Sequence, residues 1–180
     1  MRTLGAVLAG GRSSRFGSDK ALAVWHGRPL IEHVIERLRP HVDAVVVCGR
    51  AWPQGIGIPD RPAPDLGPLG GLCAALAYGA EQGFDRVVSV PCDAPTLPPP
   101  LLARLLAQDG PALLGDLPVV GVWPTRLASA LDSFLATSPS RSVRAFAKVA
   151  GAATIADTDP LPNINHHADL TALDRSFSAT

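Results

Sequence analysis

The sequence predicts an α/β fold with three layers, in which helices cover both faces of a mainly parallel sheet. Runs of β-branched and aliphatic residues, typical of strands buried on both faces, cover residues 4–8, 44–48 and 87–90. Helical patterns of apolar residues separate these runs. Strands and helices that alternate along a chain are joined by right-handed crossovers, which leave the strands parallel and the helices on both faces.

Three helices are predicted between and after these strands. The first lies in PLIEHVIERLRP, residues 29–40, where a proline prevents the helix from continuing. The second, in residues 67–83, is rich in small residues that would let it lie close to the sheet. The third is LLARLLAQ, residues 101–108, which follows three prolines. The apolar face of the first helix comprises Leu30, Val34, Ile35 and Leu38.

The second half of the chain has weaker patterns. Residues 117–124, LPVVGVWP, and residues 153–156, ATIA, are predicted to be strands. Helices are predicted over residues 125–135 and 142–150. A closing amphipathic helix is expected in ADLTALDRSF, residues 168–177. We see no internal repeat and no interdomain linker, so we expect one domain.

Length and composition fit one globular domain and argue against binding of polyanions. The chain has 180 residues, of which 47% are hydrophobic, and its 16 cationic and 16 anionic residues leave no formal net charge. It therefore lacks the broad cationic field that attracts nucleic acids or anionic membranes. Cys48, Cys73 and Cys92 are far apart, which predicts buried free thiols and neither a disulfide framework nor a zinc site. Because the apolar runs are too short for a signal peptide or a membrane span, we expect a cytoplasmic protein.

A glycine-containing loop, LAGGRSSRFGSDK, residues 8–20, directly follows the first strand. Gly10 and Gly11 have no Cβ, so backbone N–H groups there can approach a phosphate. Arg15 offers a planar fork of donors to phosphate oxygens, and Lys20 offers a compact charge. The spacing matches neither the P-loop nor the dinucleotide-binding pattern, which argues against a P-loop ATPase and a Rossmann oxidoreductase. The loop therefore predicts a triphosphate site rather than a loop with surface arginines.

Two aspartates are the other candidate ligands. Asp93, in VVSVPCDAP, comes just after a strand, where a carboxylate can hold Mg²⁺ against substrate phosphates. In IPDRPAPDLGPLGGL, Asp60 is the better ligand candidate, and Asp65 is interpreted as a turn residue. Gly67 and Pro68 then begin a helix, and the lack of a side chain at Gly67 would let a ligand pack closely against this turn.

Four motifs in order, LAGG-RSS-RFG-SDK, GPLGGL, PCDAP and NINHHADL, resemble the molybdenum cofactor guanylyltransferase family, also called molybdopterin-guanine dinucleotide biosynthesis protein A. The match runs from residue 4 to about residue 170. The resemblance implies a single nucleotidyltransferase domain over residues 1–180 with a three-layer, Rossmann-like nucleotidyltransferase fold. It also implies that GMP passes from GTP to the terminal phosphate of molybdopterin, or of the molybdenum cofactor, with Mg²⁺ as the metal ion and release of pyrophosphate.

The resemblance also assigns site residues. It places Lys20 on the phosphates and Asp93 on both the nucleotide and the metal ion. Together with Arg15, which the loop itself suggests as a phosphate donor, they form the expected catalytic set. In this family, the residues equivalent to Cys48 are often asparagine, and His166 and His167 replace Thr and Pro. By resemblance, the guanosine part of GTP is held by Leu8, Ala9, Gly10 and Asp60, and the closing segment matches at Asn163 and Asn165, which we assign to the molybdopterin side. The residue patterns themselves add Gly11, Gly67, Pro68 and Leu69 as GTP contacts, and Arg141 and Arg144 on the molybdopterin side.

Several alternatives remain open from the sequence. Arg141 and Arg144 have helical spacing and could bind the pterin's phosphate or simply decorate a helix surface. A related nucleotidyltransferase could use cobinamide phosphate, a sugar phosphate or CTP. A noncatalytic GTP-binding module is the alternative from another class. Proteins that deliver or receive the cofactor are candidate partners, and the sequence does not specify an oligomeric state.

Overall fold

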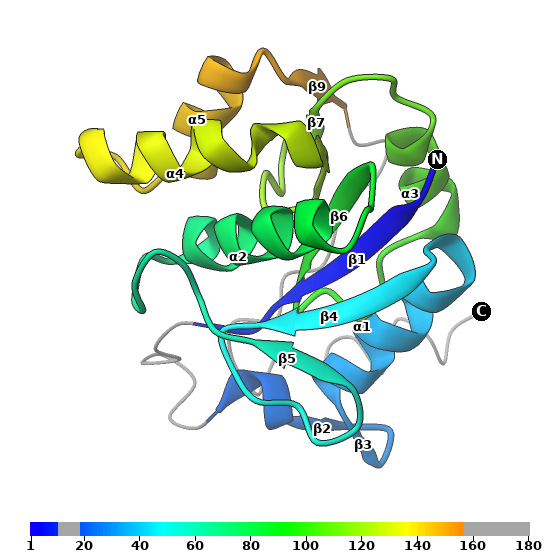
Figure 1. Cartoon of the computed structure of the whole chain (residues 1–180). Helices are drawn as coiled ribbons and strands as arrows, with labels where there is room; N and C mark the ends of the chain where they lie inside the picture. Colours follow the sequence, from blue (N-terminus) through cyan, green and yellow to red (C-terminus); the bar gives the residue numbers. More distant parts are fainter. Residues whose placement is uncertain (11–18, 157–180) are drawn as a thin grey trace.

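The computed structural model describes residues 1–10 and 19–156, and its largest element is a seven-stranded sheet. The strand order is β5-β4-β1-β6-β8-β7-β9 (Figure 1). The pairings β5–β4, β4–β1, β1–β6 and β7–β9 are parallel, and β8 is antiparallel to both β6 and β7. The predicted mainly parallel sheet is therefore confirmed. The strands are β1 (Thr3–Leu8), β4 (Ala44–Cys48), β5 (Ile56–Ile58), β6 (Arg86–Pro91), β7 (Ala112–Leu114), β8 (Gly121–Pro124) and β9 (Ala153–Ile155).

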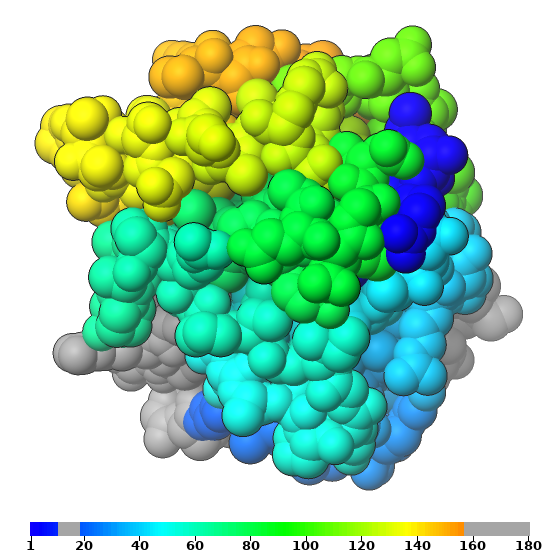
Figure 2. Space-filling model, viewed as in Figure 1, coloured from blue at the N-terminus to red at the C-terminus, as the bar shows by residue number. Residues whose placement is uncertain are grey.

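Helices cover both faces of this sheet, which confirms the three layers. α2, α4 and α5 share one hydrophobic cluster with the sheet, and α1 and α3 share a second cluster on the other face. Figure 1 shows the two groups on opposite sides, and Figure 2 shows α4 and α5 forming a continuous ridge beside α2. The helices are α1 (Leu30–Leu38), α2 (Pro68–Glu81), α3 (Pro99–Leu106), α4 (Ala128–Thr137) and α5 (Val143–Ala150), with short 3₁₀ turns η1 (Lys20–Leu22), η2 (Arg39–His41) and η3 (Thr125–Leu127).

Small residues bring α2 against the ends of β1 and β4. A Cβ added at Gly71 would lie 3.1 Å from both Cys48 Cβ and Leu8 Cδ2. A Cβ at Gly79 would lie 3.0 Å from Thr125 Cγ2. The close packing predicted from the small side chains is confirmed, and it places the first turn of α2 beside the carboxyl ends of the two strands.

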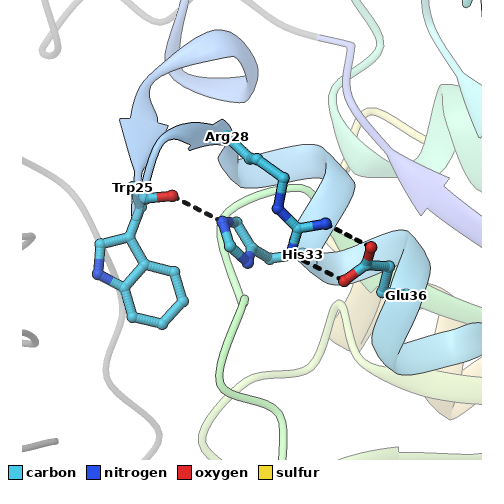
Figure 3. A network of polar contacts seen from close by, with 4 residues as sticks. All are labelled: Trp25, Arg28, His33 and Glu36. Carbon is cyan, nitrogen blue, oxygen red and sulfur yellow. Dashed lines mark hydrogen bonds and ion pairs between the residues drawn. The ribbon is translucent and has the colours of Figure 1, made fainter.

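A small hairpin ties the segment after the glycine loop to α1. Its strands are β2 (Val24–Trp25) and β3 (Arg28–Pro29). Figure 3 shows His33 Nε2 donating to the backbone oxygen of Trp25, at 2.7 Å, and Arg28 pairing with Glu36 on the same helix. The Trp25 and His33 rings also meet edge to face at 4.8 Å. These contacts fix the hairpin, and with it the turn that precedes it.

The structure corrects part of the sequence-based assignment. Within residues 117–124 only Gly121–Pro124 is a strand, because the chain turns before it and the Val120 N–H bonds back to Leu117 O. β5, β7 and the β2–β3 hairpin were missed, since strands of two or three residues give too little periodicity. The predicted closing helix lies outside the described residues. Among the helices of residues 1–10 and 19–156, none has the length and apolar character needed to cross a membrane.

Candidate active site

The carboxyl ends of three adjacent parallel strands form the floor of the candidate site. β1 lies between β4 and β6, so its two neighbours come from crossovers in opposite directions. Such a switch point is where open α/β sheets bind ligands. The backbone continues this pairing past the strands, because Ala9 N donates to Cys48 O at 2.9 Å and Cys92 N to Leu8 O at 3.1 Å. Gly10, Arg50 and Asp93 therefore emerge side by side.

Two glycines and an aspartate meet closely at this edge. Gly49 has a φ of +87°, and a Cβ there would lie 2.4 Å from Gly10 Cα and 3.0 Å from Asp60 Oδ1. A Cβ at Gly10 would lie 2.8 Å from Asp60 Oδ2. Since side chains are excluded here, the strand ends present backbone atoms and one carboxylate.

Asp60 is held in surroundings that disfavour its charge. Its Oδ1 is buried and has no hydrogen-bond partner among the described residues. Burial, with a smaller contribution from the Asp65 charge, raises the pKa of its carboxyl group. The carboxylate also lies over the first turn of α2, where a Cβ at Gly70 would be 3.3 Å from Asp60 Cβ. A buried oxygen without a partner is costly. This oxygen is therefore a ready acceptor for a ligand's N–H or O–H group.

Lys20 and Asp93 form the central ion pair. Lys20 Nζ lies 2.5 Å from Asp93 Oδ2, and the two side chains are only 15% and 19% exposed. Lys20 comes from η1, after the glycine-containing loop, and Asp93 follows β6. α3 begins six residues later at Pro99, behind Pro98 as its N-cap, so Asp93 is not the cap of that helix. The structure thus brings together a cation and a carboxylate that are 73 positions apart.

A second ion pair lies beside the first, and sequence reasoning missed it. Arg50 Nη2 is 2.6 Å from Asp19 Oδ2, and Asp19 Oδ1 accepts from Ala21 N at 3.2 Å. Asp19 is the N-cap of η1, the turn that carries Lys20. The available signal was an arginine two residues after a buried strand, at the edge where the glycines were already expected.

The cysteines are unsuited to nucleophilic chemistry. All three thiols are free; Cys48 and Cys73 are buried, and Cys92 is partly buried. Burial raises the pKa of Cys48 far above its usual range, that of Cys73 to about 11 and that of Cys92 to about 12. With these raised pKa values the thiols stay protonated near neutral pH, whereas the reactive form of a cysteine is the thiolate. The side chain of Cys48 is buried against the first turn of α2.

The remaining predicted residues fall into three groups. Gly67 has a φ of +64° and caps α2, Pro68 begins that helix, and Asp65 occupies a turn as expected, with a φ of +63°. The side chains of Leu8, Ala9 and Leu69 are buried, so only their backbones can reach a ligand. Gly11, Arg15, Asn163 and Asn165 lie outside the described residues.

The two arginines predicted on the molybdopterin side make local contacts. Arg141 Nη1 donates to the backbone oxygens of Leu135 and Ser138, both at 2.9 Å, at the end of α4. Arg144 donates through Nη2 to the backbone oxygen of Gly115. These bonds favour a structural role at the ends of α4 and β7, and a pterin-binding role remains a prediction.

The donor set at this edge fits a magnesium ion shared with a ligand. Among residues 1–10 and 19–156, no group of three or more His, Cys, Asp or Glu side chains could enclose a metal ion. Mg²⁺ does not need such a cage, since it is commonly held by one or two carboxylates together with substrate phosphates and water. Asp93 is a carboxylate of this kind, at the edge where phosphates would enter.

Comparison with known proteins identifies the family. The model of the MobA-like NTP transferase domain matches residues 5–154. The chain belongs to the MobA-like NTP transferase family. It is 37% identical over 183 residues to a molybdenum cofactor guanylyltransferase from Cereibacter sphaeroides, with 94% of each chain covered. It is 40% identical over 156 residues to the protein of that name from Sinorhizobium fredii, with 78% of this chain and 72% of the relative covered.

Solved structures show the same fold at lower sequence identity. Molybdopterin-guanine dinucleotide biosynthesis protein A from Archaeoglobus fulgidus superposes with a TM-score of 0.77 at 22% identity, and 98% of this chain and all of that one are covered. A nucleotidyl transferase from Methanothermobacter thermautotroptrophicus gives a TM-score of 0.76 at 19% identity, with 99% of both chains covered. The nucleotidyltransferase fold expected from the sequence is therefore confirmed.

Proposed function

We propose that this enzyme transfers GMP from GTP to the terminal phosphate of molybdopterin or of the molybdenum cofactor. The observation that carries the proposal is the ion pair between Lys20 and Asp93 at the switch point, beside the side-chain-free edge formed by Gly10 and Gly49. Relatives named molybdenum cofactor guanylyltransferase that match over most of the chain supply the substrates.

The reaction forms one bond and breaks one. An oxygen of the acceptor's terminal phosphate attacks the α-phosphorus of GTP, the bond from that phosphorus to the bridging oxygen breaks, and the β- and γ-phosphates leave as pyrophosphate. Such transfers depend on positioning and charge neutralisation more than on a covalent enzyme intermediate. The protonated thiols near the site agree with this, because no cysteine is required as a nucleophile.

Each described residue has a part in this scheme. Lys20 donates to phosphate oxygens that gain negative charge as the bond to pyrophosphate breaks. Asp60 accepts from the nucleoside part of GTP through its partnerless buried oxygen. The backbone at Gly10 lets the nucleotide approach closely because no side chain fits there. We also propose Arg15 as a hydrogen-bond donor to the phosphates, because it belongs to the glycine-containing loop.

Asp93 is the residue that would hold Mg²⁺ in this scheme. When bound, the ion neutralises phosphate charge and orients the reacting groups. Lys20 occupies Oδ2 of the carboxylate in the present structure, so the pair must loosen or share that oxygen as phosphates enter. Because the thiols of the described residues are free, we also propose the reducing cytoplasm as the place of the reaction.

A pyrophosphate-release assay tests the proposal. The purified enzyme is mixed with MgCl₂, each of the four NTPs and either molybdopterin, cobinamide phosphate or a hexose 1-phosphate. We expect release only with GTP and molybdopterin, and a guanine dinucleotide product by mass spectrometry. Release with CTP alone would overturn the base assignment, and release with a sugar phosphate would overturn the acceptor. GTP binding by calorimetry without turnover on any acceptor would instead indicate a noncatalytic module.

A further inference from the structure

The turn that carries Lys20 is connected to the end of β4 through a single carboxylate. Asp19 uses Oδ2 to bind Arg50 Nη2, at 2.6 Å, and Oδ1 to accept from the backbone N–H of Ala21, at 3.2 Å. η1 is only three residues long, with Leu22 N and Ala23 N closing onto the backbone oxygens of Asp19 and Lys20. Asp19 therefore helps to set the position of Lys20 from the N-terminal side of the turn, as the β2–β3 hairpin does from the other side.

Arg50 begins from a fixed point of the sheet. The N–H of Gly49 donates to Ile58 O at 2.8 Å, which extends the β4–β5 pairing beyond the strands. Gly49 also packs directly on Gly10, so the backbone before Arg50 cannot shift without moving β1. Because its backbone is fixed in this way, the guanidinium group of Arg50 can hold η1 at a constant distance from the sheet.

The Arg50 side chain is kept in place at a cost. Its Nε is buried and finds no hydrogen-bond partner within residues 1–10 and 19–156, although the side chain as a whole is 24% exposed. A partly exposed ion pair contributes little to stability on its own. A buried donor without a partner is unfavourable and calls for an explanation outside folding. The pair with Asp19 is thus poorly explained as a stabilising contact alone.

The two ion pairs are adjacent. Asp19 and Lys20 are consecutive residues, and each is one member of a pair, Asp19 with Arg50 after β4 and Lys20 with Asp93 after β6. The Arg50–Asp19 pair therefore adjoins the Lys20–Asp93 pair and is not a separate surface contact.

We propose that Arg50 is a positioning residue of the transfer reaction, which acts by holding Asp19 and so fixing the turn that places Lys20 Nζ. This inference rests on the proposed function. Displacing a catalytic group by about 1 Å can reduce a rate by about 100-fold. Arg50 is not required to touch the nucleotide in this arrangement, so its loss should lower kcat and leave the KM for GTP nearly unchanged.

Three variants test the link through kinetics. Arg50→Gln removes the charge, Asp19→Asn keeps a capping side chain but weakens the ion pair, and the third carries both changes. We expect each single variant to lose about 10- to 100-fold in kcat with less than a threefold change in the KM for GTP. The double variant should lose no more than the worse single, because both changes break one link. Losses that multiply in the double variant would show independent roles and overturn the inference.

A readout without turnover is available because the chain has only two lysines, Lys20 and Lys148. Lys148 is exposed on α5 and serves as the internal standard. Partial labelling with an amine-reactive reagent, followed by peptide mass spectrometry, compares the two. We expect labelling of Lys20 relative to Lys148 to rise at least threefold in Arg50→Gln and to stay constant in Arg104→Gln, which removes an exposed arginine from α3.

The outcomes separate this inference from the proposed function. If the unaltered enzyme releases no pyrophosphate from GTP with any acceptor, the proposed function fails while the labelling ratio still tests the link. If the unaltered enzyme is active and Arg50→Gln keeps its full kcat or its labelling ratio, the inference alone fails. If Arg50→Gln loses its thermal unfolding transition, Arg50→Lys replaces it as the test variant. A lysine cannot reproduce the geometry of the guanidinium group, so kcat should still fall severalfold. An unchanged kcat in Arg50→Lys would refute the positioning role.

Discussion

Replacing Gly49 by alanine should damage both the fold and the site, because the contact between β1 and β4 leaves no room for a Cβ. The added atom would lie 2.4 Å from Gly10 Cα, 2.6 Å from Gly10 N and 3.0 Å from Asp60 Oδ1. Two of the three contacts are with backbone, which cannot rotate away as a flexible side chain can. Gly49 also has a φ of +87°, which side-chain-bearing residues rarely adopt.

The expected magnitude has two parts. A left-handed backbone costs an L-residue about 1–2 kcal/mol relative to glycine. Overpacking at a site that cannot relax adds about 1–3 kcal/mol. For a chain of this length 1 kcal/mol corresponds to about 2–4 °C in Tm, so a loss of about 2–5 kcal/mol predicts a fall of roughly 4–20 °C.

Calorimetry with a matched control separates the two parts. Gly151 ends α5 with a φ of +67°, and a Cβ there would meet no atom within 4 Å. Gly151→Ala therefore carries the backbone strain without the clash and should lower Tm by only about 2–8 °C. We also expect Gly49→Ala to lose GTP affinity and Gly151→Ala to retain it. Equal Tm values for the two variants, with GTP binding intact in both, would refute the close contact at the strand ends.

Three further substitutions test the assigned roles. Lys20→Ala should reduce kcat at least about 100-fold in the pyrophosphate assay with an unchanged circular dichroism spectrum, and a loss below threefold would remove Lys20 from the reaction. Asp93→Asn should show a similar loss and require more Mg²⁺ for half-maximal rate; near-normal turnover at low Mg²⁺ would contradict the metal assignment. Asp60→Asn should weaken GTP binding by calorimetry and leave Tm at pH 7 unchanged or slightly raised. The sign follows because the folded pKa of Asp60 lies above its unfolded value of about 3.9. The stabilising contribution of Asp60 is therefore present below that value and is lost as pH rises through the folded pKa. A Tm at pH 7 lowered by more than about 5 °C would contradict this.

The parts of the fold that the sequence predicted are those with long, regular patterns. The limits expected for β4 were those observed, and β1 and β6 each extend only one or two residues further. α2 was expected from its small residues, which pack against the strand ends, and from its opening proline, which occupies the first position of the helix. β5 and β7 are only three residues long and form by backbone pairing, β5 with β4 and β7 with β8 and β9. Three residues are too few to show a strand pattern, and the pairing itself is not contained in the local sequence.

The candidate site was predictable where a residue directly follows a strand. Asp93 and Gly10 each come two residues after a strand, β6 and β1, so parallel strand order alone brings them together. Asp60 follows β5, a strand that was missed, and its place beside Gly10 came from the resemblance and not from the pattern. Arg50 follows β4 in the same way, but its partner lies 31 positions earlier in a turn, and only the three-dimensional structure shows that pairing.

The charges in the described part of the site imply that a triphosphate cannot bind there unaided. Asp19, Asp60 and Asp93 outnumber the two cations, Lys20 and Arg50, and both cations are already paired with carboxylates. A polyphosphate brought to this edge would meet net negative charge, which is unfavourable at short range. Added positive charge is therefore required, and Mg²⁺ at Asp93 together with the arginines of the glycine-containing loop would supply it. The raised pKa of Asp60 acts in the same direction, because a carboxyl group that protonates more readily repels the incoming phosphates less.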